Sequence, residues 1–262
     1  MQGGGNDPPN LTRPVVMGSS MTFRVFGDES TTEGSGPGSY RIQGGIWVQE
    51  QGLTVVREAL AKLRAEHRTG GGHGELKWSG LRGGRLRPRA RGLIEMFFHG
   101  PAAEFLRFEC IAVQHGDDQT YGGCAETRDL GVYKTFFVLF KNRLPPGSTS
   151  IIALDERPGL RPGAEEQLRS CLNGAGARVS PSFTVTGCYA VCSRSEDLVQ
   201  LADLLCGAVA WDWNGRPPRN GAKQQAHGLI CKHLGSTTLH RETYRDPKFG
   251  IWRYRPRQIG AA

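Results

Sequence analysis

The sequence predicts an α/β protein with a mixed β-sheet and helices on both faces of that sheet. Two apolar segments, Thr22–Ser30 and Ser150–Glu156, have the composition of buried central strands, and each ends on adjacent carboxylates. The first strand is followed directly by another strand pattern, as in a hairpin, and strand and helix patterns then alternate. Such intermixing is typical of a mixed sheet covered by helices within one domain, and 262 residues can build one large core.

The expected strands are short segments rich in β-branched and aromatic residues. They are Thr22–Ser30, Tyr40–Gln49, Phe105–His115, Ser150–Glu156 and Phe183–Cys192. Within the second strand, Gly44 and Gly45 indicate a bulge or a close approach of another part of the backbone. Taken alone, Asp28 in the first strand is also compatible with the start of a turn.

The expected helices have apolar residues at helical spacing. They are Leu53–His67, a helix that begins near Pro88, Leu130–Leu144, Ala164–Leu172, Glu196–Trp213 and Ala222–Leu234. The aromatic stripe of Leu130–Leu144 is expected to face the core. Residues 1–20 are rich in Gly, Pro and Asn and are predicted to be disordered, so residues 21–262 form the single predicted domain, which ends in a basic C-terminal tail.

The charge of the chain favours a polyanionic partner, nucleic acid first. Lys and Arg exceed Asp and Glu by eight. Arginines are dense between positions 82 and 91, and again after position 240, where Trp252 and Tyr254 lie among them as in surfaces that stack bases. A solvated charged face would explain either group nearly as well. The candidate nucleic-acid contacts are Arg82, Arg85, Arg87, Arg89, Arg253 and Arg255.

The seven cysteines form no CxxC pair and no regular framework, which favours a reducing compartment. No signal-peptide pattern is visible, and no apolar run reaches the roughly 18 residues that a membrane span needs. We therefore expect a cytoplasmic protein without a membrane partner.

Four carboxylates lie at structurally marked positions. Asp28 and Asp155 end apolar strands, Glu75 lies in a short segment between glycine-rich loops, and Asp203 lies inside the apolar helix Glu196–Trp213. Each has an ordinary alternative: Asp155 can begin a surface loop, Glu75 can pair with Lys77, and Asp203 can be a satisfied buried group. If the four converge, they repel one another and raise one another's pKa values. A divalent cation removes that problem, and carboxylate oxygens suit Mg²⁺ or Mn²⁺.

Five motifs in one order resemble a known group of proteins. They are FGDES at 26–30, ELKW at 75–78, LDE at 154–156, VQLADLLCGAV at 199–209 and KFGIWRYRP at 248–256. The order of their acids is similar to that of the ribonuclease-H-like superfamily of metal-dependent nucleases. The motifs themselves resemble the bacterial family called "domain of unknown function thirty-eight hundred", over about Phe23 to Pro256.

This resemblance implies a ribonuclease-H-like fold and a two-metal site. Asp28 would be shared by both ions, Glu75 and Asp155 would complete one, and Asp203 the other. Lys77 would touch a phosphate or Glu75, and Gln200 would orient Asp203. Two ions about 4 Å apart can clamp the attacking and leaving oxygens of a phosphodiester.

Other constellations are weaker. His227 and Cys231 share a helix face, but His233 points elsewhere and no fourth zinc ligand is near. No Ser or Cys nucleophile signature surrounds Ser30, Cys124 or Cys171, and no phosphate-binding glycine motif opens a helix.

The sequence therefore predicts a Mg²⁺- or Mn²⁺-dependent nuclease acting on RNA, DNA or a hybrid. The alternative is a non-catalytic module on the same scaffold that binds nucleic acid or a protein. A third hypothesis is a defence or mobile-element effector whose nuclease activity is restrained by another subunit, and a homo-oligomer is equally compatible with the sequence.

Overall fold

The computed structural model describes residues 21–30, 38–67, 75–115, 128–157, 162–215, 221–244 and 246–255. The predicted disorder of residues 1–20 lies outside this part of the chain. Among the described residues, no helix is both long enough and apolar enough to cross a membrane.

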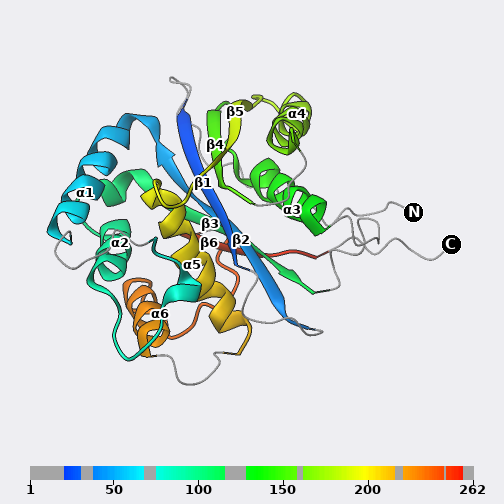
Figure 1. The fold of residues 1–262 in the computed structure, drawn as a ribbon. Coiled ribbons are helices and arrows are strands. Elements are labelled where there is room, and N and C mark those ends of the chain that lie inside the picture. The colour runs from blue at the N-terminus through cyan, green and yellow to red at the C-terminus, as the bar shows by residue number, and fades with distance from the viewer. Residues whose placement is uncertain are drawn as a thin grey trace.

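A six-stranded mixed sheet forms the centre of the described structure (Figure 1). Its strands run in the order β5-β4-β1-β2-β3-β6. Antiparallel pairing joins β1 to β2 and β2 to β3, whereas β4 and β5 extend the sheet parallel to β1. The bounds are β1 Thr22–Ser30, β2 Tyr40–Gln49, β3 Leu106–Gln114, β4 Thr149–Asp155, β5 Thr184–Val191 and β6 Phe249–Arg253. An antiparallel meander continued by two parallel strands is the ribonuclease-H-like arrangement, so the predicted fold class is confirmed.

Helices cover both faces of the sheet (Figure 1). The described helices are α1 Leu53–Glu66, α2 Pro88–Phe98, α3 Arg128–Arg143, α4 Ala164–Gly176, α5 Asp197–Trp213 and α6 Gly221–His233. Side chains of α1, α2, α5 and α6 share one hydrophobic core with Phe26, and those of α3 and α4 share a second core with Val25. Since neighbouring residues of a strand point to opposite faces, β1 belongs to both cores.

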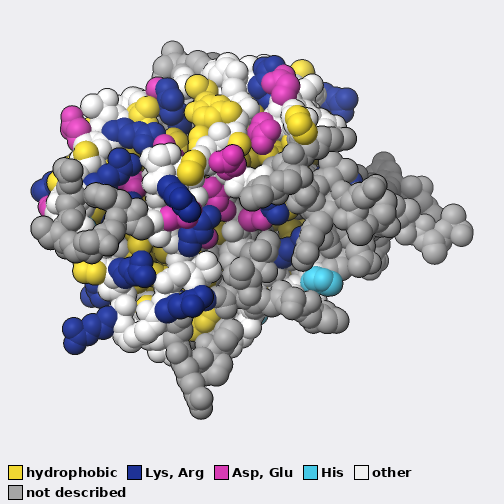
Figure 2. Space-filling model, viewed as in Figure 1, with side chains coloured by type: hydrophobic (Ala, Val, Ile, Leu, Met, Phe, Trp, Pro, Cys, Tyr) yellow, Lys and Arg dark blue, Asp and Glu magenta, His cyan; other side chains and the backbone are white. Residues whose placement is uncertain are grey.

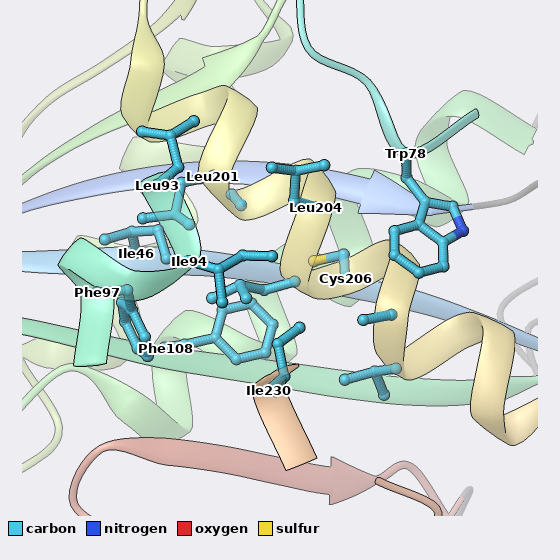
Figure 3. Packing of buried hydrophobic residues seen from close by; sticks show 14 of the residues in the cluster. Ile46, Trp78, Leu93, Ile94, Phe97, Phe108, Leu201, Leu204, Cys206 and Ile230 are labelled. Carbon is cyan, nitrogen blue, oxygen red and sulfur yellow. The ribbon is translucent and has the colours of Figure 1, made fainter. Parts of the chain in front are cut away.

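Helix α5 is buried along its whole length, which explains why its sequence is apolar on every face. It packs on β1 and β2 and also contacts α2 and α6, so Leu201 and Leu204 belong to the same hydrophobic cluster as Ile94 and Ile230 (Figure 3).

Glycines allow this helix to lie close to its neighbours. A Cβ atom on Gly44 would lie 2.8 Å from Cys206 Sγ and 2.8 Å from Cys110 Cβ. The register of β2 is continuous on both sides, so Gly44 marks a close approach of α5 and not a bulge. On the other side of α5, a Cβ on Gly207 would lie 2.1 Å from Trp78 Cγ, in the short 3-10 helix η2 (Trp78–Gly80).

The last strand, β6, differs from the sequence prediction, which treated this region as a basic tail. Phe249 and Ile251 are buried, and β6 pairs in parallel with β3 at Phe108–Ala112. The strand has only five residues and ends on Arg253, and Lys248 and Arg255 lie close to its two ends. These charges obscure its short apolar pattern in the sequence.

Gly207→Ala is expected to destabilise the protein, because the added methyl group overlaps the Trp78 ring. Overpacking of this kind costs about 1–3 kcal/mol in the free energy of unfolding. Urea unfolding followed by tryptophan fluorescence measures it.

Gly174→Ala is the matched control. Gly174 lies inside α4, and a Cβ there meets no atom within 4 Å, so this change should raise stability by about 0.5–1 kcal/mol. Equal gains in the two variants would show that helix propensity, and not the contact with Trp78, governs position 207.

Candidate functional site

A pocket of about 190 Å³ opens where β1 and β4 end. One wall carries polar groups from β1, β4, α5 and the segment before α2, and the opposite wall is the apolar side of α3. Its lining residues are Gly27, Asp28, Glu29, Ser30, Lys77, Trp78, Ser79, Val132, Tyr133, Phe136, Leu154, Asp155, Arg157 and Asp203. The structure thus brings three of the four predicted metal ligands into one pocket.

Asp28 is held at this edge by the parallel pairing of β1 with β4. Gly27 pairs with Leu154, so the next residues along the two strands are Asp28 and Asp155. The backbone N–H of Glu29 donates to Asp28 Oδ1 at 2.6 Å. Asp28 Oδ2 is buried and has no hydrogen-bond partner among the described residues. Burial first, and then the charges of Asp203 and Asp155, raise the pKa of Asp28 well above its usual value.

Asp203 reaches the same pocket from the middle of α5 and accepts a hydrogen bond from the backbone N–H of Trp78. Burial raises its pKa to about 6. The hydrogen bond from Trp78 and the charge of Lys77 oppose this shift, and the charges of Asp155 and Glu75 add to it. A buried carboxyl group beside other carboxylates is therefore costly to ionise here.

Glu75 joins the pocket through Lys77. Lys77 Nζ lies 2.8 Å from Asp155 Oδ2 and 3.2 Å from Glu75 Oε1, so its ammonium bridges two of the predicted ligands. Burial lowers the pKa of Lys77, but the hydrogen bond to Asp155 and the charges of Asp28 and Asp155 outweigh burial and raise it overall. The Ser193 hydroxyl donates to the same oxygen, Glu75 Oε1, and so gives that carboxylate a second partner.

The hydrogen bonds of Gln200 connect it to groups other than Asp203, the residue that the resemblance implies it would orient. Its Oε1 accepts from the N–H of Leu76 at 3.1 Å and its Nε2 donates to the carbonyl of Ser193 at 2.6 Å. The amide therefore ties the Glu75 segment to the turn after β5, and the structure records no hydrogen bond from it to Asp203. Gln200 is fully buried, so this tie is part of the framework around the site.

The predicted basic contacts separate into two groups. Arg82, Arg85 and Arg87 are exposed. The other three pair with residues of the protein: Arg89 with Asp197 at 2.7 Å and Gln200 at 3.1 Å, Arg253 with Gln114 at 3.0 Å, and Arg255, although it is exposed, with Glu242.

Figure 2 shows acidic side chains near the middle of one face with Lys and Arg side chains beside them. Because they are exposed, Arg82, Arg85 and Arg87 are better candidates for contact with a polyanion than the arginines that pair within the protein.

Three further residues belong to the site that the sequence reading did not include. Glu29 continues β1, lines the pocket and forms an ion pair with Arg157, which follows β4. Ser193 follows β5. Parallel strands end at the same edge of a sheet. The position of Arg157 and Ser193 just beyond β4 and β5 is therefore the sequence signal that could have identified them.

His227 and His233, which were considered as zinc ligands, make other contacts. His227 Nε2 lies 2.8 Å from Asp212 Oδ2, and His233 pairs instead with His99 at 2.9 Å. Within the part of the chain that the structure describes, no group of three or more His, Cys, Asp or Glu side chains is arranged to hold a metal ion.

The donor chemistry around Asp28 nevertheless suits a hard divalent cation. Its buried Oδ2 lacks a partner, and the neighbouring oxygens belong to carboxylates that repel one another.

No protein-family model and no curated protein matches the sequence. Among solved structures, the chain is similar to one described as "Structure of the PCNA:RNase HII complex from Archaeoglobus fulgidus", with a TM-score of 0.40 and 13% identity. The match covers 86% of this chain and 83% of that chain. The likeness is distant.

Asp28→Asn and Asp203→Asn are each expected to stabilise the metal-free protein at pH 7. A carboxyl group whose pKa is raised in the folded state contributes stability below its unfolded pKa, near 4, and that contribution is lost as the pH rises through the folded value, about 6 for Asp203. An amide has no charge to desolvate, so we expect a gain of about 1–3 kcal/mol at pH 7 and a flatter pH profile. Thermal unfolding in EDTA between pH 4 and 8 measures both.

Glu58→Gln, on the exposed side of α1, serves as the control and should leave the profile unchanged. A loss of stability at pH 7 in both Asn variants would mean that the ionised carboxylates are compensated within the folded chain.

Proposed function

We propose that this protein is a divalent-metal-dependent nuclease that hydrolyses phosphodiester bonds of RNA or DNA. The observation that carries the proposal is the convergence of Asp28, Asp155 and Asp203 on one pocket at the carboxyl edge of the sheet. Buried carboxylates with raised pKa values are costly for the fold, and such groups concentrate at functional sites. The finer similarity to the "domain of unknown function thirty-eight hundred" family is part of this proposal.

Two Mg²⁺ or Mn²⁺ ions would be held by the four predicted carboxylates. Asp28 would contact both ions, Glu75 and Asp155 one, and Asp203 the other. When bound, such ions supply Lewis-acid stabilisation of the phosphate and lower the pKa of an attacking water.

The chain itself positions these oxygens. The N–H groups of Glu29 and Trp78 fix Asp28 and Asp203, and the Ser193 hydroxyl fixes Glu75. The side-chain amide of Gln200 accepts a hydrogen bond from the N–H of Leu76 and so holds the segment that carries Glu75. Hydrogen bonds of this kind orient a ligand carboxylate before a cation arrives.

Nucleic acid is the partner that this site and its surroundings favour. The exposed Arg82, Arg85 and Arg87 precede α2, directly after the segment that carries Glu75 and Lys77. A polyanion attracted by these arginines would pass the pocket. We extend the proposal to a cytoplasmic location, because Cys110 and Cys206 are buried free thiols.

The decisive test measures Mn²⁺ binding and cleavage together. Wild-type protein should bind Mn²⁺ in calorimetry and cleave at least one member of a panel of single-stranded RNA, single-stranded DNA, duplex DNA and RNA–DNA hybrid. Asp28→Asn and Asp203→Asn should each reduce cleavage by about 100-fold or more, since even the partners of metal ligands contribute 10–100-fold.

Glu58→Gln is again the control and should cleave like the wild type. Cleavage that persists in both Asn variants and in EDTA would refute the proposal. Salt-sensitive nucleic-acid binding without any Mn²⁺ binding would instead establish the non-catalytic binding module.

Substitution of the exposed arginines tests the nucleic-acid surface separately. The triple change Arg82→Gln, Arg85→Gln and Arg87→Gln should weaken binding of single-stranded nucleic acid in EDTA and reduce the salt slope by about 0.7 for each lost phosphate contact. Fluorescence anisotropy at several salt concentrations measures this.

The matched control removes the same charge from three exposed positions outside this segment, Lys62, Lys141 and Arg178. If both triple variants lose the same affinity, net charge alone controls binding, and the arginine segment is not a contact surface.

A further inference from the structure

We propose that Lys77 is a built-in counter-cation, which a divalent ion must displace from Glu75 and Asp155 before the site can be loaded. The inference rests on the proposed function and concerns how access of metal to that site is controlled. It predicts that the lysine and the ion compete for the same carboxylate oxygens.

The contacts of Lys77 are the first step in the argument. Its Nζ lies 2.8 Å from Asp155 Oδ2 and 3.2 Å from Glu75 Oε1. These oxygens come from segments 80 residues apart in the sequence, at the end of β4 and before η2. The ammonium group therefore occupies the space between two carboxylates that are assigned to one ion.

The charge around the pocket is the second step. Of the residues that line it, Asp28, Glu29, Asp155 and Asp203 are acidic, and Lys77 and Arg157 are basic. Arg157 forms an ion pair with Glu29, which is outside the predicted ligand set. Arg194 lies 3.9 Å from Glu75, but its side chain is 80% exposed and therefore strongly screened. Within this lining, Lys77 is the cation placed against the ligands themselves.

The absence of a preformed cation cage is the third step. No group of three or more possible ligands in the described ranges is arranged to hold a metal ion. Hydrogen bonds from an ammonium are longer than the roughly 2.1 Å bonds of Mg²⁺ to oxygen. An ion that takes the place of the ammonium would therefore have to draw Glu75 and Asp155 closer to its centre than Lys77 holds them.

Displacement also gives the lysine a second role. Its side chain is 36% exposed and has a flexible four-carbon stem, so the ammonium can move outward once its two carboxylates bind an ion. In that position it can contact a phosphate of an incoming nucleic acid. Metal loading and substrate recognition would thereby be coupled through one side chain.

Mn²⁺ titration by calorimetry tests the proposal. Lys77→Gln keeps a polar side chain, one atom shorter than that of lysine, and removes its charge. It should bind Mn²⁺ about 10-fold more tightly than the wild type, within the 5- to 150-fold range typical of coupled sites. In EDTA the same variant should unfold at a lower temperature, because Glu75 and Asp155 lose their counter-cation.

Arg157→Gln is the matched control. It removes an equal charge from the same pocket, but from a residue that pairs with Glu29. Its effect on Mn²⁺ affinity should be much smaller than that of Lys77→Gln. Equal gains in the two variants would show a general field effect and would overturn direct competition.

Failure of this inference can be told apart from failure of the proposed function. If the wild type binds Mn²⁺ and cleaves, but Lys77→Gln binds no more tightly, only the role of Lys77 is refuted. If neither protein binds Mn²⁺, the metal-dependent function and the counter-cation role are both refuted. If Lys77→Gln binds Mn²⁺ and the wild type binds it weakly or not at all, competition by the lysine is supported.

Discussion

The close packing of α5 against the sheet is the constraint on which the rest of the structure depends. The helix can lie directly over β2 because Gly44 has no side chain, and η2 can lie directly over the helix because Gly207 has none. These two contacts set the depth of the helix. They place Asp203 at the pocket that Asp28 already lines and bring the N–H of Trp78 within hydrogen-bonding reach of Asp203. The position of the acids is therefore a consequence of steric fit in the core.

The same packing creates an electrostatic conflict. An apolar helix removes water from the end of β1, and the carboxylates gathered there lose the solvent that would separate their charges. Backbone N–H groups, a serine hydroxyl and a lysine ammonium compensate part of the negative charge of these carboxylates. These partners satisfy some of the oxygens, whereas Asp28 Oδ2 is left without one among the described residues. Burial of apolar side chains in the two cores thus stabilises the fold, whereas the buried carboxylates of the pocket destabilise it when they are ionised.

The sequence predicted the fold better than it predicted the partners of the site residues. Runs of buried residues identified β1 and β4, and a charge inside an apolar helix identified Asp203, because both patterns follow from burial along a single element. The hydrogen bond between Gln200 and Leu76 spans 124 positions of the sequence, and no local pattern encodes it. Arginines show the same limit. Composition cannot separate Arg85, which is exposed, from Arg89, which is engaged with Asp197.

Strand β6 has a consequence for the order in which the molecule is completed. It pairs with β3 across about 140 positions of sequence, so the outer edge of β3 has no partner from β6 until the chain has been synthesised past Arg253. Loop closure over such a distance is slow, and an unpaired edge can pair with another chain during that time. The segment that resembles a charged tail in the sequence therefore contains the strand that completes the sheet beside β3. After it has paired, β6 is itself the edge strand of the sheet, and Arg253 within it and Lys248 before it carry the kind of charge that discourages pairing with another chain.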